Sequence, residues 1–325
     1  MTALVEQRLR WTVPVTQPLL LCSQIQRSGG TLLTRLLDSH PMCFAHPNEL
    51  RWGKPKAWPE VDLSALTNPE AVLEEIGENW PRKFAAKGYQ KSANFLPHSG
   101  RQRRYPFIFD EDLQRKIFAT AVEGRHQTQR DILNGYLTSL FNAWLDYQNL
   151  YRSPKRWVTA FEPRLILKRD GVDKFFADYP DGLLATLVRE PGAWLSSYSV
   201  HMPSKDTQTS LRLWMESVDK SVRAHEARPT RVIVLIFEEL VRETEAVMRA
   251  LCERMVIPFS DVLLEPTYNS MPVLSDSSHE LVTGIDTRVT ERHRTTLSAE
   301  QLELVACTAT PRYTEMRERF SLVAR

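Results

Sequence analysis

Two adjacent glycines at the start of an apolar helix pattern could hold an anion. The stretch QRSGGTLLTRLLDSHP (26–41) directly follows the apolar run PLLLCSQI (18–25). A strand that leads through a glycine turn into a helix brings backbone N–H groups and the positive end of the helix dipole to one point. Glycines let a ligand approach the backbone closely, and Arg27 adds a guanidinium whose fork matches a tetrahedral oxyanion. The candidate cradle for phosphate or sulfate comprises Arg27, Ser28, Gly29, Gly30 and Thr31.

A second stretch with the same organisation is LVREPGAWLSSYSVH (187–201). It leaves an apolar run at Arg189 and enters a helical pattern in which Pro191 suits the first turn. Ser197 follows Arg189 by eight positions. In open parallel sheets, ligands bind outside the carboxyl ends of the strands. Two such junctions on neighbouring strands therefore predict a ligand with two separate anionic groups, the second held by Arg189 and Ser197.

Short β-rich runs that alternate with helical periodicity predict a parallel α/β core to position these residues. The predicted strands are 19–25, 182–188 and 231–237, with a weaker one at 156–162. Trp, Pro and helical patterns fill 47–154, which we interpret as a helical insertion where specificity often lies. A loop-rich stretch runs from 258 to 296, and a closing helix begins at Ser298, with Gln301 in the capping-box position.

Composition narrows the class of partner. The 325 residues include 42% hydrophobic and 25% charged residues, and the formal net charge is +2, so we expect a globular protein that does not bind nucleic acid. No apolar run is long enough to span a membrane and the N-terminus lacks a signal-peptide core, which predicts a cytoplasmic protein.

The basic cluster GRQRRY (100–105) is either a solvated face or a contact for an acidic acceptor. Four scattered cysteines predict reduced, buried thiols and no metal site.

A kinase-like interpretation of the first stretch fails on one residue type. The nucleotide-binding P-loop has the pattern GxxxxGK[ST], and no lysine follows these glycines. A P-loop nucleotide kinase is therefore disfavoured. For the first motif alone, a glycine turn that serves only chain geometry stays an alternative.

Both stretches together resemble the sulfotransferases. QRSGGTLLTRLLDSHP is similar to their 5′-phosphosulfate loop, written PRSGTTLL and followed by a helix and His-Pro, and VREPGAWLSSY is similar to their 3′-phosphate motif. FEELVRETEAVMRALCERMVIP (237–258) resembles their Tyr-Glu-Asp-Leu unit, so that the likeness covers about 19–46 and 157–296. Gln26 replaces a proline and Gly30 a threonine. Arg27 stands where cytosolic aryl and steroid sulfotransferases have lysine, and is more like the tyrosylprotein and many bacterial branches.

This resemblance implies one sulfotransferase domain over 1–325, with a P-loop-like parallel sheet flanked by helices and with 47–154 as a substrate lid. It implies 3′-phosphoadenosine 5′-phosphosulfate (PAPS) as donor, adenosine 3′,5′-bisphosphate (PAP) as product, and no metal. Arg27 would meet the charge that develops on the bridging oxygen. The segment 282–294 would cover the adenine and the 3′-phosphate. The residues expected to bind the donor are Arg27, Ser28, Gly29, Gly30, Thr31, Leu32, Arg189 and Ser197.

Sulfuryl transfer to a hydroxyl or amine also needs a general base. Glu49 is the first candidate, because the tyrosylprotein-like branch has a glutamate just beyond the His-Pro. His46 is the second, since imidazole suits proton abstraction at neutral pH. The acceptor is expected to be a small molecule, a lipid or a carbohydrate, and the sequence does not indicate the oligomeric state. A non-catalytic binding module is the remaining alternative, which the joint presence of the four motif side chains Arg27, Ser28, Arg189 and Ser197 disfavours.

Overall fold

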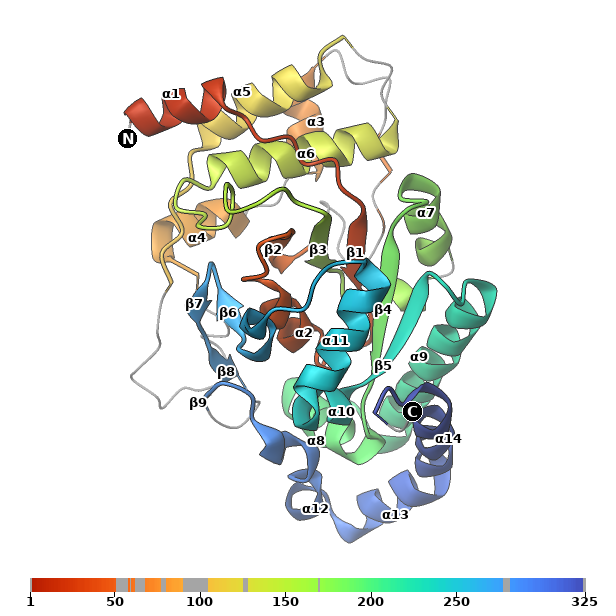
Figure 1. Cartoon of the computed structure of the whole chain (residues 1–325). Helices are drawn as coiled ribbons and strands as arrows, with labels where there is room; N and C mark the ends of the chain where they lie inside the picture. The colour runs from red at the N-terminus through yellow and green to blue at the C-terminus, as the bar shows by residue number, and fades with distance from the viewer. Residues whose placement is uncertain are drawn as a thin grey trace.

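A five-stranded parallel sheet lies at the centre of the structure, a computed structural model (Figure 1). The structure describes residues 2–50, 58, 60–61, 68–76, 80–89, 105–124, 128–168, 170–276 and 281–323. The strands are β1 (Leu19–Cys22), β2 (Cys43–Glu49), β3 (Trp157–Phe161), β4 (Leu183–Val188) and β5 (Val232–Ile236). Their order in the sheet is β2-β3-β1-β4-β5, and every neighbouring pair is parallel. All five carboxyl ends therefore meet at one edge of the sheet, with those of β1 and β4 adjacent.

Four of these strands confirm the sequence prediction, and β2 corrects it. The sequence CFAHPNE of β2 is partly polar and contains Pro47, so it lacks the continuous apolar run typical of a buried strand. Proline is tolerated on an edge strand or at an irregularity. Both conditions hold for Pro47. The strand β2 lies at the edge of the sheet, and its register with β3 shifts between Ala45 and Glu49. The first residues assigned to the helical insertion, 47–49, thus belong to the sheet.

Helices cover both faces of the sheet (Figure 1). On one face, Leu20 of β1 shares a buried apolar core with Leu36 and Leu251. On the other, Val234 of β5 shares a core with Trp214. The first core includes side chains of α2 (Gly30–Leu37), α10 (Phe237–Arg242) and α11 (Thr244–Met255), and the second includes side chains of α8 (Pro191–His201), α9 (Thr207–Ala227) and α14 (Thr310–Phe320).

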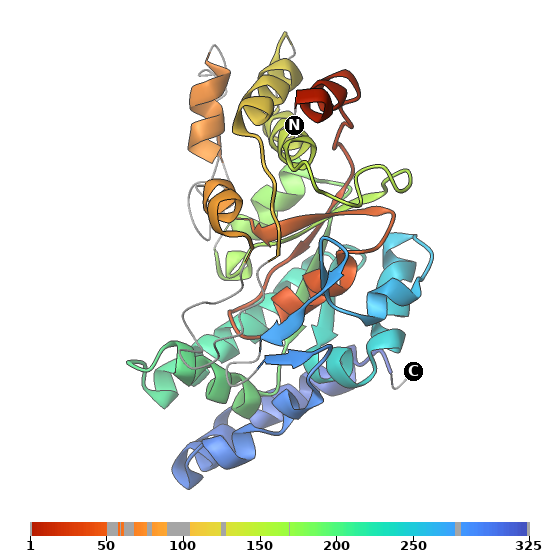
Figure 2. The ribbon, with the colours of Figure 1, turned by 90° about the vertical axis from the view of Figure 1, so that its left-hand side faces the viewer.

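The described helices of the insertion group with the N-terminal helix. These helices are α1 (Thr2–Arg10), α3 (Pro69–Ile76), α4 (Trp80–Lys87), α5 (Glu111–Val122) and α6 (Gln129–Ala143). Figures 1 and 2 show α1, α3, α5 and α6 together at one end of the molecule. The backbone N–H of Val15, just before β1, donates to Oγ1 of Thr138 in α6 over 2.9 Å. The helices α1, α3, α5 and α6 therefore lie at the amino ends of the strands, whereas Trp80 of α4 packs against His46 of β2. The lid role of 47–154 stays a prediction.

The stretch 258–296, predicted to be loop-rich, contains short strands. Two antiparallel pairs follow α11, namely β6 (Thr267–Tyr268) with β7 (Met271–Pro272) and β8 (Leu274–Asp276) with β9 (Leu281–Thr283). After α12 (His293–Thr296), the helix α13 (Ala299–Thr308) begins with the predicted capping box of Ser298 and Gln301. A short helix α7 (Gly171–Asp178) precedes β4.

Two expectations from the sequence concern the cysteines and the membrane, and the structure bears on both. All four cysteines are free; Cys22, Cys43 and Cys252 are buried as predicted, but Cys307 is exposed on α13. Of the helices in the described residues, none combines the length and apolar character needed to cross a membrane. The basic residues 100–104 lie outside the described residues.

Candidate active site

The loop between β1 and α2 has the backbone shape of an anion cradle. Gly29 is the N-cap of α2, with φ of 100°, and no side chain caps this helix. A Cβ on Gly29 would lie 2.3 Å from the Phe237 ring, so both conformation and space require glycine. Arg27 also has a positive φ, 71°, which is unfavourable for a residue with a side chain. The N–H groups in the first turn of α2 are therefore available to an anion.

The two predicted junctions are joined directly by hydrogen bonds. Nε of Arg27 donates to Oγ of Ser197 over 2.9 Å, and Nη1 of Arg189 donates to the Arg27 carbonyl over 2.8 Å. The Trp194 indole, one turn before Ser197, donates to the Gln26 carbonyl over 2.8 Å. These bonds form because β1 and β4 are neighbours in the sheet. The structure thus brings Arg27, Arg189 and Ser197 to one place, as the sequence predicted.

Arg189 is a buried cation with donor capacity to spare. Its guanidinium lies 4.6 Å from the centre of the Phe237 ring, and its Nη2 donates to the Val289 carbonyl over 2.9 Å. Its Nε is buried and has no hydrogen-bond partner within the described part of the chain. Burial lowers the pKa of Arg189 to about 10. The Glu238 carboxylate opposes this shift, and the positive charge of Arg27 adds to it. The group stays cationic at neutral pH, and an anion beside it would offset its desolvation.

The N-terminus of α8, unlike that of α2, is already capped by the protein. The Glu190 carboxylate accepts hydrogen bonds from the backbone N–H groups of Gly192 (3.0 Å) and Ala193 (2.5 Å). Glu238 accepts from the Glu190 N–H over 3.1 Å and from the Tyr313 hydroxyl over 2.5 Å, and burial raises the pKa of Glu238. At this second junction, side chains rather than helix N–H groups are thus available to an anion.

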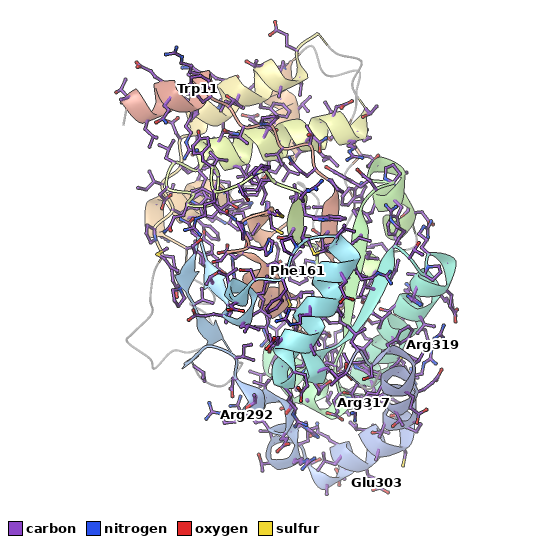
Figure 3. All side chains as sticks on the ribbon, viewed as in Figure 1. Trp11, Phe161, Arg292, Glu303, Arg317 and Arg319 are labelled. Atoms are coloured by element: carbon purple, nitrogen blue, oxygen red, sulfur yellow. The ribbon has the colours of Figure 1, made fainter. Side chains whose placement is uncertain are left out.

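Most of the predicted site residues line one cavity of about 230 Å³ at the carboxyl edge of the sheet. Ser28 is buried but is not among the lining residues. Figure 3 labels two further lining residues, Phe161 at the end of β3 and Arg292 in the C-terminal third. The predicted residues that line the cavity are Arg27, Gly29, Gly30, Thr31, Leu32, Glu49, Arg189 and Ser197.

The two candidates for the base occupy different surroundings. Glu49, at the end of β2, lines the cavity and pairs in register with Phe161. His46 is buried outside the lining, with its ring edge-on to Trp80 and its Nδ1 bonded to the Asn48 carbonyl over 2.8 Å. Burial lowers the pKa of His46 to about 4. Of the two groups, only the carboxylate is placed to reach a molecule in the cavity.

His201 is a lining residue that sequence reasoning missed. It stands one helical turn after Ser197, on the same face of α8. Burial lowers the pKa of His201, the positive charge of Arg27 lowers it further, and the negative charge of Glu49 raises it. His201 thus interacts electrostatically with both Arg27 and Glu49. The i, i+4 spacing from Ser197 was the sequence signal that could have identified it.

The segment predicted to cover the donor does lie against the 3′-phosphate motif. Asp286 is buried and caps the short helical turn Thr287–Thr290, since its carboxylate accepts hydrogen bonds from the backbone N–H and Nε of Arg288. Nη2 of Arg292 lies 3.4 Å from the Asp286 carboxylate, and Nε2 of His293 lies 3.5 Å from that of Glu190. Asp286, Arg292 and His293 all line the cavity. Their spacing has no family pattern, which is why sequence reasoning named none of them.

No cluster of three or more His, Cys, Asp or Glu side chains suited to a metal ion occurs within the part of the chain that the structure describes. The groups of the site that suit an anion are the uncapped N-terminus of α2 and the two arginines, Arg27 and Arg189, and the Glu49 carboxylate lines the same cavity. In open parallel sheets of this kind, ligands bind at the carboxyl ends of the strands, which is where these groups meet.

Comparison with known proteins identifies the family. The profile described as the sulfotransferase family matches residues 25–261, about three quarters of the chain. The chain therefore belongs to the sulfotransferase family, and its reaction is the transfer of a sulfuryl group. A search among curated proteins gave no match.

Solved structures of sulfotransferases share the fold. The sulfotransferase domain of the Synechococcus PCC 7002 olefin synthase is 18% identical, with a TM-score of 0.53 over 92% of this chain and 98% of that one. The sulfotransferase domain from the curacin biosynthetic pathway is 16% identical, with a TM-score of 0.50 over 92% and 99%. At these identities the likeness shows the fold.

Proposed function

We propose that this sulfotransferase takes its sulfuryl group from PAPS and transfers it to a hydroxyl or amine by in-line displacement, releasing PAP. The observation that carries the proposal is the joining of Arg27, Arg189 and Ser197 at one cavity. These side chains come from the two loops whose sequences resemble the 5′-phosphosulfate and 3′-phosphate motifs.

The residues present fit a donor with anions at both ends of its ribose. One anionic group would lie at the uncapped N-terminus of α2, where Gly29 admits a close approach. The second would lie at Ser197 and at Arg189, whose buried Nε has no partner in the described ranges. PAPS supplies an activated sulfuryl group whose transfer leaves a bisphosphate. A nucleoside triphosphate would place its charges in one row, which these two separate junctions do not match.

Arg27 would stabilise the negative charge that develops on the bridging oxygen as the bond from sulfur to the leaving 5′-phosphate breaks. Its positive φ turns the chain at this point, and the bond from its Nε to Ser197 fixes the guanidinium. Preorganised donors aimed at developing charge are typically the largest electrostatic contribution to catalysis. Because that charge is greatest in the transition state, Arg27 would contribute more to rate than to donor affinity.

Glu49 would remove the proton from the acceptor. It lies on the opposite side of β3 and β1 from the 3′-phosphate motif in sheet order, and it lines the cavity. The same cavity continues to Tyr89, Tyr105 and Val273, which would form the acceptor side. Aromatic walls of this kind suit a small molecule, a lipid chain or the face of a sugar.

The proposal can be tested by donor binding and by transfer. Calorimetry with PAP, 5′-AMP and ATP in parallel should give the tightest binding for PAP, since it alone presents both anions at the right ends of the ribose. Labelled PAPS with a panel of hydroxylated small molecules, lipids and sugars should then yield a labelled product. Arg27→Ala should lower the transfer rate by about 10²- to 10³-fold. Equal affinity for PAP and 5′-AMP would exclude PAPS as the donor.

A further inference from the structure

Gln24, two residues beyond β1, has a buried amide group that the protein leaves unsatisfied. The residue is 1% exposed, and Nε2 has no hydrogen-bond partner among the residues that the structure describes. The rest of the residue is held in place: its backbone carbonyl accepts from the N–H of Arg164 over 2.9 Å, and its Oε1 accepts from the Cys22 thiol over 3.4 Å. With Oε1 in this contact, the NH₂ end of the amide lies next to Gly30. Gln24 is also one of the cavity-lining residues.

Gly30 makes room for this amide. An added Cβ at Gly30 would lie 2.1 Å from Nε2 of Gln24 and 2.6 Å from the Phe161 ring. Gly30 is not among the glycines with positive φ, so space rather than conformation requires glycine here. In the motif that this loop resembles, the same position is threonine. The space of that side chain is thus occupied in this protein by the Gln24 amide.

An unsatisfied buried amide is costly, and the surroundings of Gln24 suggest what would satisfy it. Buried polar groups in proteins almost always have a partner, because an unpaired one loses its hydration without compensation. Nε2 lies beside the first residue of α2, at the helix end where the dipole and the backbone N–H groups favour an anion. An anionic oxygen held in this loop would accept a hydrogen bond from it.

We propose that Gln24 is a donor-binding residue of this sulfotransferase. Its side-chain amide donates a hydrogen bond to an oxygen of the anionic group held by the β1–α2 loop, and Gly30 is glycine in order to admit it. The inference rests on the proposed function, because it assigns the 5′ end of the nucleotide to this loop. It adds a residue outside the motif that the sequence resembles.

Three replacements of Gln24 separate hydrogen bonding from packing. Gln24→Met keeps the length of the side chain without the amide, Gln24→Glu replaces the NH₂ by a carboxylate oxygen, and Gln24→Ala empties the space. PAP and adenosine 3′-monophosphate, which lacks the 5′ group, serve as the two probes in calorimetry. PAP affinity should fall by about 10-fold in Gln24→Met and further in Gln24→Glu, where like charges meet, because a hydrogen bond to a charged group is lost or reversed. Affinity for adenosine 3′-monophosphate should stay within about twofold.

Thermal unfolding of each variant controls for a folding defect, and Gly30→Ala gives an independent measurement. Gly30→Ala should lower the melting temperature, and combining it with Gln24→Ala should recover part of the loss, because residues in contact are not additive. If wild-type protein binds PAP and Gln24→Met and Gln24→Glu bind it equally well, Gln24 does not contact the donor and the inference is wrong. If wild-type protein prefers neither PAP nor 5′-AMP, the PAPS assignment itself fails.

Discussion

Nε of Arg27 donates a 2.9 Å hydrogen bond to Oγ of Ser197, a residue 170 positions away in the chain. The bond ties the loop after β1 to the helix after β4. Ser197 and Arg27 both line the cavity, so the bond holds the guanidinium in place beside the proposed site of the second anion. In the proposed complex, the two ends of the donor would be coupled through this one contact of the protein.

Ser197→Ala should therefore affect both binding and rate. We expect PAP affinity to fall by about 10-fold, because a hydrogen bond to a charged group is lost. The transfer rate at saturating PAPS should also fall, because Arg27 loses the contact that orients it. Calorimetry and turnover at saturating donor measure the two effects separately. Ser210→Ala, which removes a buried hydroxyl of α9 bonded to the Asp206 carbonyl, is the control and should change neither. A rate loss with full PAP affinity would place Ser197 outside the donor site.

Arg189→Ala should remove most of the preference for PAP over 5′-AMP. The two nucleotides differ only in the 3′-phosphate, and a hydrogen bond to a charged group contributes about 1.5–3 kcal/mol. The ratio of the two dissociation constants is the quantity to measure, because general damage to the site changes both constants. Such damage is expected, since Arg189 also supports the carbonyls of Arg27 and Val289. Arg189→Lys, which keeps the charge without the fork, should retain part of the ratio. An unchanged ratio in Arg189→Ala would contradict the assignment.

Glu49→Gln should lower turnover by about 10²- to 10⁴-fold, the usual effect of a lost general base. PAP affinity should hardly change, because the carboxylate would face the acceptor. The same assay on His201→Asn tests the imidazole that shares the cavity with Glu49. Full turnover in Glu49→Gln with loss in His201→Asn would assign the base to His201. A matched loss in His46→Ala, with Glu49→Gln active, would instead favour the buried histidine.

Local patterns explain why the two anion-binding loops could be predicted from the sequence. In both, an apolar run leads through a short turn with an arginine into a helical pattern, all within about twenty residues, as in 19–41 and 182–201. The strand β2 was not predicted, because an edge strand with a proline carries no such pattern. Gln24 was not named as a site residue for a different reason. Its proposed contact with the donor depends on the space left by Gly30, which only the folded chain shows. The capping of α8 by Glu190 likewise needs the geometry of the helix end.

The pH dependence of stability should carry the signature of His46. Its pKa of about 4 in the folded protein lies below the ordinary value of 6.5, because burial disfavours the cation and Arg35 adds to that effect. Between these values the unfolded chain binds more protons than the folded one. The free energy of unfolding therefore falls as the pH drops below 6.5, by about 3 kcal/mol at pH 4 from this group alone, and it is unaffected by His46 above pH 7.

His46→Gln removes this titration while keeping a side chain that can bond the Asn48 carbonyl. Urea unfolding of both proteins from pH 4.5 to 7.5 gives the difference in unfolding free energy, in which all other titrating groups cancel to a first approximation. That difference should favour the wild-type protein least at pH 4.5, increase up to about pH 6.5 and then level off. Parallel curves would mean that the imidazole titrates equally in both states. With the predicted result, His46 stays neutral in the folded protein near pH 6, so a fall in turnover near that pH would not come from its protonation.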